Sequence, residues 1–233
     1  MPQTLSVLVP VYNERATIER LLTEVVSVDT GLTLEVLVGD DGSSDGTREI
    51  LSRLALPGVK VIFMPDNVGR GGVLKYLWTL ATGDIYVHQD ADLEYDPRDY
   101  IALLEPILAE RADVVYGSRF KGSIEGMRFA NRLGNLFMSA AARTLYGAQV
   151  SDLMTCYKMY RASFIRGIQI QANGFDFEAE FTARLAQRGA RFAEVPVSFR
   201  GRTVEEGKKI RAFDAVRVMR ELIRCKLSGE PVG

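Results

Sequence analysis

The sequence predicts an α/β fold with a Rossmann-like, mostly parallel central sheet and helices on both faces. Four apolar runs of strand length lie at Leu5 to Val11, Val36 to Val38, Val59 to Met64 and Asp84 to His88. Strands that are apolar throughout are typical of parallel sheets that are buried on both sides. Because each run ends in polar or glycine-rich residues, we expect a ligand site beyond the carboxyl ends of these strands.

The segments between these runs carry apolar residues three or four positions apart, which is the spacing of one face of an α-helix. Alternation of such segments with strands favours a doubly wound sheet over a sandwich or a helical bundle. The apolar positions are Ile18, Leu21, Leu22 and Val25 in the first segment, Ile50, Leu51 and Leu54 in the second, and Leu74, Leu77, Trp78 and Ala81 in the third.

Length and composition bound the possible architectures. With 233 residues, of which 47% are hydrophobic, the chain can bury one large core. No apolar run approaches the roughly 20 residues of a membrane span, and the N-terminus lacks the pattern of a signal peptide, so we expect a cytoplasmic chain. Cys156 and Cys225 are too few for a disulfide framework or a zinc site, and His88 is the only histidine.

The charge is unevenly distributed, although the net charge is only −1. Residues 117 to 147 contain five basic residues and one acid, and residues 200 to 226 contain nine basic residues and four acids. This asymmetry predicts an anionic partner for the second half of the chain. We do not expect nucleic acid, because no known binding motif occurs and the aromatic residues do not alternate with the basic ones.

Two carboxylates, Asp90 and Asp92, follow the fourth apolar run directly. Oxygen ligands at this position suit Mg²⁺ or Mn²⁺, and such ions complete their shells with substrate phosphates. By itself the pattern is also compatible with an acidic surface turn. The polar clusters that follow the other strands favour the metal and diphosphate interpretation.

Five motifs in order resemble family 2 inverting glycosyltransferases with the GT-A fold. They are Val9 to Glu14, Asp40 to Thr47, Asn67 to Gly72, Asp90 to Leu93, and Gly117 to Phe120. The resemblance covers residues 4 to about 211 and is greatest to polyprenyl-phosphate (dolichyl-phosphate) mannose and glucose synthases. It implies a metal-dependent, inverting transfer of a hexose from a nucleotide sugar of the GDP-mannose or UDP-glucose type to a polyprenyl phosphate.

The resemblance also implies a nucleotide-sugar site and its metal ligands. Asp40 matches the carboxylate that accepts hydrogen bonds from the base, while Ser44 or Asp45 would cap a helix that starts near Thr47. Glu94 stands where many synthases have glutamine, and with Asp90 and Asp92 it would complete the metal ligands. The implied nucleotide-sugar residues are Pro10, Tyr12, Glu14, Val38, Asp40, Asp41, Arg70, Asp90, Ala91 and Asp92.

An acceptor-phosphate site follows from the same resemblance. Its implied residues are Arg119, Arg128 or Arg132, Arg202 and Lys208, with Asp90, Asp92 and Arg119 as the catalytic set. Arginine suits this role because its planar guanidinium donates two parallel hydrogen bonds to phosphate. Gly207 beside the lysine departs from the usual family form, and a solvated charge run is the alternative for Lys208 and Lys209.

The domain prediction is a catalytic domain over residues 1–211 and an amphipathic helix with a tail over 212–233. The catalytic domain divides into a nucleotide-sugar part (1–116) and an acceptor part (117–211). A helix between Arg128 and Leu145 and another between Ala212 and Leu227 each have an apolar face flanked by arginines. Either face could lie on the cytoplasmic face of an anionic membrane, but for the first helix packing against the core is preferred.

Three other functions remain open at this point. A family 2 enzyme with a hydroxyl acceptor would need a carboxylate base, for which Asp152, Asp176, Glu178 and Glu180 are the candidates. A nucleotidyltransferase would also hold Mg²⁺ at strand ends, but its glycine-rich signature is missing near the first strand. A non-catalytic nucleotide-sugar binder would not need the intact Asp90 and Asp92 pair.

Overall fold

The computed structural model describes residues 3–127, 129–202 and 212–228, and the side chains of 212–214 are not described. In the first half, β1 (Thr4–Val11), α1 (Ile18–Ser27), β2 (Thr33–Asp40), α2 (Thr47–Arg53), β3 (Val59–Phe63), α3 (Arg70–Leu80), β4 (Ile85–His88) and α4 (Tyr100–Leu108) alternate. The second half contains β5 (Val114–Ser118), β6 (Ile124–Glu125), α5 (Phe129–Tyr146), β7 (Lys158–Arg161), α6 (Phe177–Gln187), β8 (Phe192–Pro196), β9 (Phe199–Arg200) and α7 (Ala212–Ser228).

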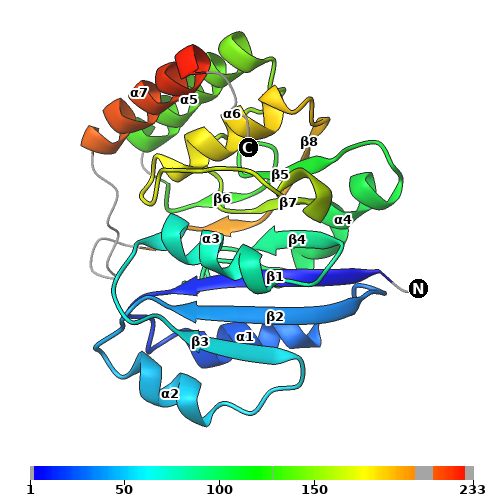
Figure 1. Cartoon of the computed structure of the whole chain (residues 1–233), viewed down its shortest axis with the longest axis vertical. Helices are drawn as coiled ribbons and strands as arrows, with labels where there is room; N and C mark the ends of the chain where they lie inside the picture. Colours follow the sequence, from blue (N-terminus) through cyan, green and yellow to red (C-terminus); the bar gives the residue numbers. More distant parts are fainter. Residues whose placement is uncertain (1–2, 128, 203–211, 229–233) are drawn as a thin grey trace.

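Seven strands form one sheet in the order β3-β2-β1-β4-β7-β5-β8 (Figure 1). All neighbours pair in parallel except β7, which runs antiparallel between β4 and β5. The prediction of a mostly parallel sheet is therefore confirmed. Because β7 pairs with β4 on one side and β5 on the other, the two halves of the chain share a single sheet.

The helices bury apolar side chains on both faces of this sheet. Leu5, Val7 and Val9 of β1 pack in one core with residues of α1, α2 and α4, whereas Leu8 points into a second core with residues of α3, α5, α6 and α7. The alternation of side chains along β1 produces these two layers. Helices on both faces are therefore confirmed, and α5 and α7 lie side by side at the end of the molecule opposite β3 (Figure 1).

The local predictions for the first half are confirmed with two exceptions, the cap of α2 and the burial of the third strand. The N-cap of α2 is Gly46 and not Ser44 or Asp45, and it makes no side-chain cap hydrogen bond. The four apolar positions of α1 are fully buried, and α2 begins at Thr47, whose amide donates to the Asp45 carboxylate at 3.0 Å. The strand at 59–63 is not buried on both faces, since Phe63 is 40% exposed. β3 is the edge strand of the sheet, so among the described residues no further strand lies beyond it to complete the burial.

The prediction that the first amphipathic helix packs its apolar face against the core is wrong. Phe129, Leu133 and Phe137 on its apolar face are 79%, 57% and 67% exposed, while α5 turns Asn135 and Ser139 inward. The inward polar residues bond to buried polar groups of the 152–154 segment, and this requirement sets the rotation of the helix. None of the described helices combines the length and apolar character that crossing a bilayer requires.

We expect Gly39→Ala to destabilise the fold by about 1–3 kcal/mol, because overpacking a filled core forces neighbouring groups to shift. A Cβ at Gly39 in β2 would lie 2.4 Å from Cγ1 of the buried Val73 in α3. Urea unfolding measures the change. The control is Gly134→Ala in α5, where a Cβ meets no atom within 4 Å and helix propensity predicts a gain of roughly 0.5–1 kcal/mol. Equal effects of both substitutions would contradict this view of the β2–α3 contact.

Candidate functional site

The polar clusters predicted from the sequence meet at the carboxyl ends of β1, β2 and β4. The strand order reverses direction between β1 and β4, since β2 and β3 lie on one side of β1 and all later strands lie on the other. Ligands of open α/β sheets bind at such a switch point. Glu14 follows β1, Asp40 ends β2, and Asp90 and Asp92 follow β4.

Asp40 has one oxygen available for a ligand. Its Oδ2 accepts the amide of Ser43 at 3.3 Å and pairs with Nε of Arg48 at 3.1 Å. Its Oδ1 is buried and has no hydrogen-bond partner among the described residues. A buried acceptor without a donor is costly, so this oxygen suits the N–H of a bound base. The predicted base contact fits this geometry and stays a prediction.

Several other predicted nucleotide-sugar residues have structural roles. Both oxygens of Asp41 are occupied, by the amides of Val68 at 2.7 Å and Gly69 at 2.9 Å, and burial raises the pKa of this carboxyl. Val38 and Ala91 are part of the apolar core, so their side chains do not face a pocket. By contrast, Tyr12 is 41% exposed at the end of β1. Pro10 is buried within the same strand.

Arg70 begins α3 and lies between two carboxylates. Its Nε donates to Asp90 at 2.8 Å, its Nη1 donates to Glu178 of α6, and its Nη2 is buried with no partner in the described part of the chain. Although burial opposes the charged form, Asp90 and Glu178 hold the pKa of Arg70 well above its usual value. The guanidinium is therefore a fixed cation with one nitrogen left to donate.

Glu178 also contacts a second cation, which is buried. Lys158 of β7 is fully buried, donates to the carbonyl oxygens of Leu153 at 3.1 Å and Thr155 at 2.5 Å, and bonds to the other oxygen of Glu178. Burial lowers the pKa of Lys158, and Glu178 opposes that shift. Asp90, Arg70, Glu178 and Lys158 thus form a chain of alternating charges, which we call the ion chain. The sequence analysis did not identify Lys158, and nothing about a lysine in an apolar strand marks such a role.

Asp92 and Glu94 form the acidic group best suited to a divalent cation. Desolvation raises the pKa of Asp92 to about 7, and the negative charges of Asp90 and Glu94 add to this shift. Carboxylate oxygens with an excess of negative charge fit Mg²⁺ or Mn²⁺. Asp90 differs from the prediction, because Arg70 already occupies it. Within the described residues, the trio of potential ligand atoms lying within 4.8 Å is Glu180, Glu221 and Cys225, and not the predicted Asp90, Asp92 and Glu94.

Arg202 joins the predicted acceptor side to these carboxylates. Its amide donates to Glu94 at 2.7 Å, its Nε donates to the carbonyl oxygen of Asp92 at 3.1 Å, and its guanidinium forms an ion pair with Glu14. The structure therefore places Arg202 directly beside the nucleotide-sugar residues. Lys208 and Arg128, which were predicted to bind the same phosphate, lie outside the described residues.

Arg119 is anchored more tightly than its predicted role in phosphate binding suggested. Its Nε and Nη2 each donate to Asp152 at 2.8 Å, its side chain is 10% exposed, and its guanidinium lies 4.9 Å from the centre of the Phe199 ring. The structure thus shows a buried, bidentate ion pair at this position. Arg132 is exposed on α5 and lies 5.7 Å from the centre of the Phe120 ring.

Three of the four candidate bases have buried carboxylates with several partners each. Asp152 accepts from Arg119, Asn135 and the Arg119 amide, and Glu178 belongs to the ion chain. Glu180 accepts two backbone amides and pairs with Arg184 and Arg224. Asp176 is less enclosed and accepts the Gly174 amide at 3.1 Å. Of the four candidates, Asp176 is therefore the one whose surroundings best suit a general base for a hydroxyl acceptor.

Comparison with known proteins identifies the family. Residues 6–168 match the family model described as glycosyl transferase family 2. The chain belongs to this family. It is 33% identical to an undecaprenyl-phosphate mannosyltransferase of Micrococcus luteus, covering 86% of this chain and 85% of the relative. It is 31% identical to a dolichyl-phosphate hexose transferase of Haloferax volcanii, with coverage of 86% and 85%.

Solved structures agree with this assignment. Glucosyl-3-phosphoglycerate synthase of Mycobacterium tuberculosis in complex with UDP has a TM-score of 0.72 and 26% identity, covering 99% of this chain and 82% of the other. Its complex with Mn²⁺, UDP-glucose and phosphoglyceric acid has a TM-score of 0.71 at 23% identity, covering 99% and 81%. The family and the fold establish this protein as a GT-A glycosyltransferase that transfers a hexose.

We expect Arg119→Met to destabilise the fold by about 3–5 kcal/mol, because it leaves the buried Asp152 carboxylate without its cation. Adding Asp152→Asn should recover part of this loss, since the uncompensated charge is then removed. Urea unfolding of the two single variants and the double variant measures the coupling. Strictly additive losses would show that Arg119 and Asp152 contribute independently. In that case Arg119 would be available for the acceptor alone.

Proposed function

We propose that this glycosyltransferase moves a hexose from a GDP-mannose or UDP-glucose type donor to a polyprenyl phosphate, with inversion at the anomeric carbon. The relatives named above, whose names specify undecaprenyl-phosphate and dolichyl-phosphate, support this acceptor class. The observation that carries the proposal is the outer face of α5, where Phe129, Leu133 and Phe137 are exposed beside Arg132. A polyprenyl phosphate combines the same two properties, an anionic head and an apolar chain.

Asp92 and Glu94 would hold Mg²⁺ or Mn²⁺ with the donor. Bound there, the cation would supply positive charge that stabilises the departing nucleoside diphosphate. The structural neighbour that contains Mn²⁺ with UDP-glucose supports a divalent metal. Asp40 would accept from the base through its unpartnered Oδ1, and Nη2 of Arg70 would donate to the diphosphate.

The acceptor would attack without a dedicated general base. A phosphate monoester is already anionic at neutral pH, so its oxygen can form the new bond to the anomeric carbon as the bond to the diphosphate oxygen breaks. Three of the four candidate bases are buried in hydrogen bonds and ion pairs, which agrees with such a mechanism. Positioning of the two anions and stabilisation of their charge would then supply most of the acceleration.

The same surface supports peripheral contact with the cytoplasmic face of the membrane, where such an acceptor resides. The exposed side chains of α5 are joined by Val216, Ile223 and Leu227 of α7, which are 62%, 47% and 83% exposed. The inner face of α7 instead buries Val218, Leu222 and Cys225. Apolar side chains flanked by arginines are typical of helices that lie in an anionic interface.

Asp92→Asn should reduce nucleoside-diphosphate release by about a hundredfold or more, because it weakens the metal and diphosphate site. Release is measured from a panel of UDP- and GDP-sugars with Mn²⁺ or Mg²⁺, with and without a short-chain polyprenyl phosphate. Removal of the metal with EDTA should abolish it. The matched control is Glu49→Gln, an exposed acid on α2, which should leave release unchanged.

Two outcomes would contradict the proposal. Donor binding with no release that depends on the lipid phosphate would reject a polyprenyl phosphate acceptor and direct the search to hydroxyl acceptors and Asp176. Release of pyrophosphate in place of a nucleoside diphosphate would indicate nucleotidyl transfer.

A further inference from the structure

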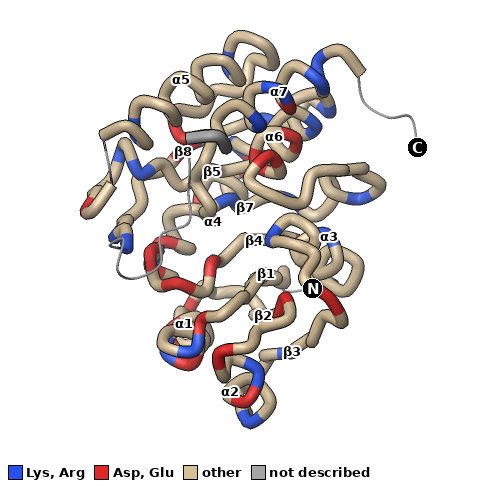
Figure 2. The backbone as a smooth tube through the Cα atoms, turned by 90° about the vertical axis from the view of Figure 1, so that its left-hand side faces the viewer, with Lys and Arg blue, Asp and Glu red and all other residues tan. Residues whose placement is uncertain are grey.

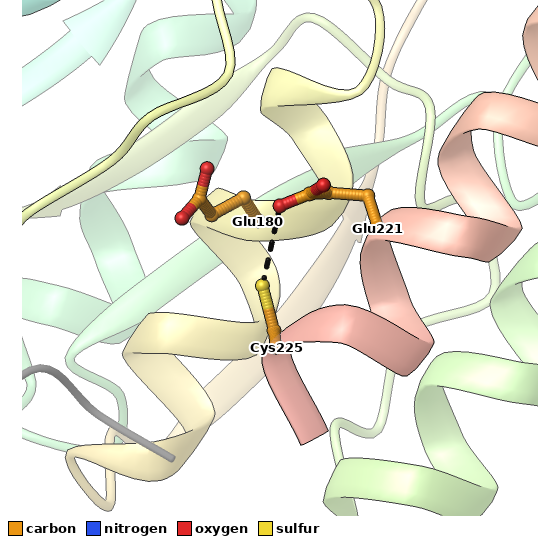
Figure 3. A group of neighbouring side chains, drawn as sticks. All are labelled: Glu180, Glu221 and Cys225. Atoms are coloured by element: carbon orange, nitrogen blue, oxygen red, sulfur yellow. Dashed lines mark hydrogen bonds between the residues drawn. The ribbon is translucent and has the colours of Figure 1, made fainter. Parts of the chain in front are cut away.

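Helix α6 carries two buried glutamates, Glu178 and Glu180, and their surroundings differ. Both oxygens of Glu180 are occupied, since Oε2 accepts two backbone amides and Oε1 pairs with Arg224 of α7 at 2.9 Å. Acidic and basic residues adjoin where α6 and α7 meet (Figure 2). Glu221 and Cys225 of α7 belong to the same cluster, and the Cys225 thiol donates to Glu221 at 3.4 Å (Figure 3). Because arginine already neutralises these carboxylates, we assign this cluster to the attachment of α7.

Glu178, two residues earlier in α6, contacts a different set of charges. Its side chain is 4% exposed, one of its oxygens accepts Nη1 of Arg70, and the other accepts Nζ of Lys158. Nζ of Lys158 also donates to the carbonyl oxygens of Leu153 and Thr155. Three acceptors around one nitrogen require three N–H donors, which only the protonated ammonium supplies. Lys158 is therefore a buried cation that occupies one oxygen of Glu178.

The guanidinium of Arg70 uses only two of its nitrogens for these ion pairs. Nε donates to Asp90 at 2.8 Å and Nη1 donates to Glu178, whereas Nη2 is buried and has no hydrogen-bond partner among the described residues. Arginine commonly binds a carboxylate through two parallel N–H donors. Glu178 accepts only one donor from Arg70, because its second oxygen is bonded to Lys158. The position of Lys158 thus explains why Nη2 stays available.

We propose that Lys158 is a positioning residue for the donor: by holding the second oxygen of Glu178, it keeps Nη2 of Arg70 free for the diphosphate. The inference rests on the proposed function, in which Arg70 donates to the departing diphosphate. Without Lys158, Glu178 accepts both terminal nitrogens of Arg70, so that an internal ion pair competes with the donor. The ring of Tyr116 in β5, whose centre lies 4.7 Å from Nζ of Lys158, helps to hold the ammonium in place.

Lys158→Met tests this role, because methionine has a similar shape and lacks the charge. Calorimetry measures the Kd of UDP and GDP, and a ligand-observed NMR titration measures the Kd of uridine and guanosine, which lack the phosphates. Both are carried out in EDTA, so that metal binding does not contribute. For the nucleoside diphosphate that the wild type binds, we expect Lys158→Met to raise the Kd by about tenfold to a hundredfold, the effect of losing one hydrogen bond to a charged group. The Kd of the matching nucleoside should stay unchanged.

A second variant separates positioning from a loss of stability. Lys158→Met leaves Glu178 with a single cation, and adding Glu178→Gln removes the acid that then competes for Arg70. The double variant has no uncompensated acid at this position and should fold even if Lys158→Met does not. We expect it to bind the nucleoside diphosphate nearly as tightly as the wild type, since a neutral amide competes less for Nη2 than a carboxylate does. Thermal unfolding should confirm that each variant is folded at the temperature of the titration.

Lys121→Met is the matched control, because Lys121 also pairs with a buried glutamate, Glu194 of β8, at 3.0 Å, and neither residue belongs to the ion chain. It should change neither Kd. Equal weakening of nucleoside and nucleoside diphosphate by Lys158→Met, or no weakening of either, would overturn the inference. So would a folded double variant that has lost its affinity for the diphosphate, since the loss would then not depend on Glu178.

Binding and turnover separate this inference from the proposed function. If Lys158→Met selectively weakens binding of the nucleoside diphosphate but the wild type shows no release that depends on a polyprenyl phosphate, the proposed transfer fails and the positioning role stands. If release depends on the lipid phosphate but Lys158→Met leaves binding of the nucleoside diphosphate unchanged, the transfer stands and the positioning role fails.

Discussion

The ion chain of Asp90, Arg70, Glu178 and Lys158 is the constraint on which the site depends. Its four charges come from the loop after β4, from α3, from α6 and from β7. Glu178 and Lys158 are buried, and each needs a partner because an unpaired buried charge costs several kcal/mol. This requirement connects the first half of the chain to the second half. It also holds Arg70 in a position where Nη2 has no hydrogen-bond partner among the described residues.

Two other arginines of the site have different roles: Arg119 is fixed by an ion pair, and Arg202 connects several segments of the chain. Arg119 is held by both oxygens of Asp152 and by the Phe199 ring, and Arg202 spans Glu14, the Asp92 carbonyl and Glu94. Through Arg202, the segment that precedes the undescribed residues 203–211 reaches the loop that we expect to hold the metal. The residues predicted to bind the donor and Arg202, which is predicted to bind the acceptor, are therefore in direct contact.

The two outer helices, α5 and α7, each have an inner face that packs on the protein and an outer face that is exposed. The inward face of α5 is polar where Asn135 and Ser139 satisfy the 152–154 segment, and the inner face of α7 is apolar. In both helices, apolar side chains are also left exposed on the outer face. Burying polar groups under α5 thus has a consequence at the surface: phenylalanine and leucine side chains are exposed on the same helix that supports the Arg119–Asp152 pair through Asn135.

Much of the fold and part of the site could be predicted from the sequence. The apolar runs and helical spacing determined the strands, their mostly parallel pairing and the edge where Glu14, Asp40 and Asp92 gather, because these follow from local periodicity and chain direction. The ordered motifs determined the family. Only the tertiary structure decided that Asp41 fastens a loop, that Arg119 pairs with Asp152, and that Lys158 supports Arg70. It likewise decided which faces of α5 and α7 point outward. Such contacts join residues far apart in the chain, and the burial of charge that selects them exists only once the helices and strands have packed.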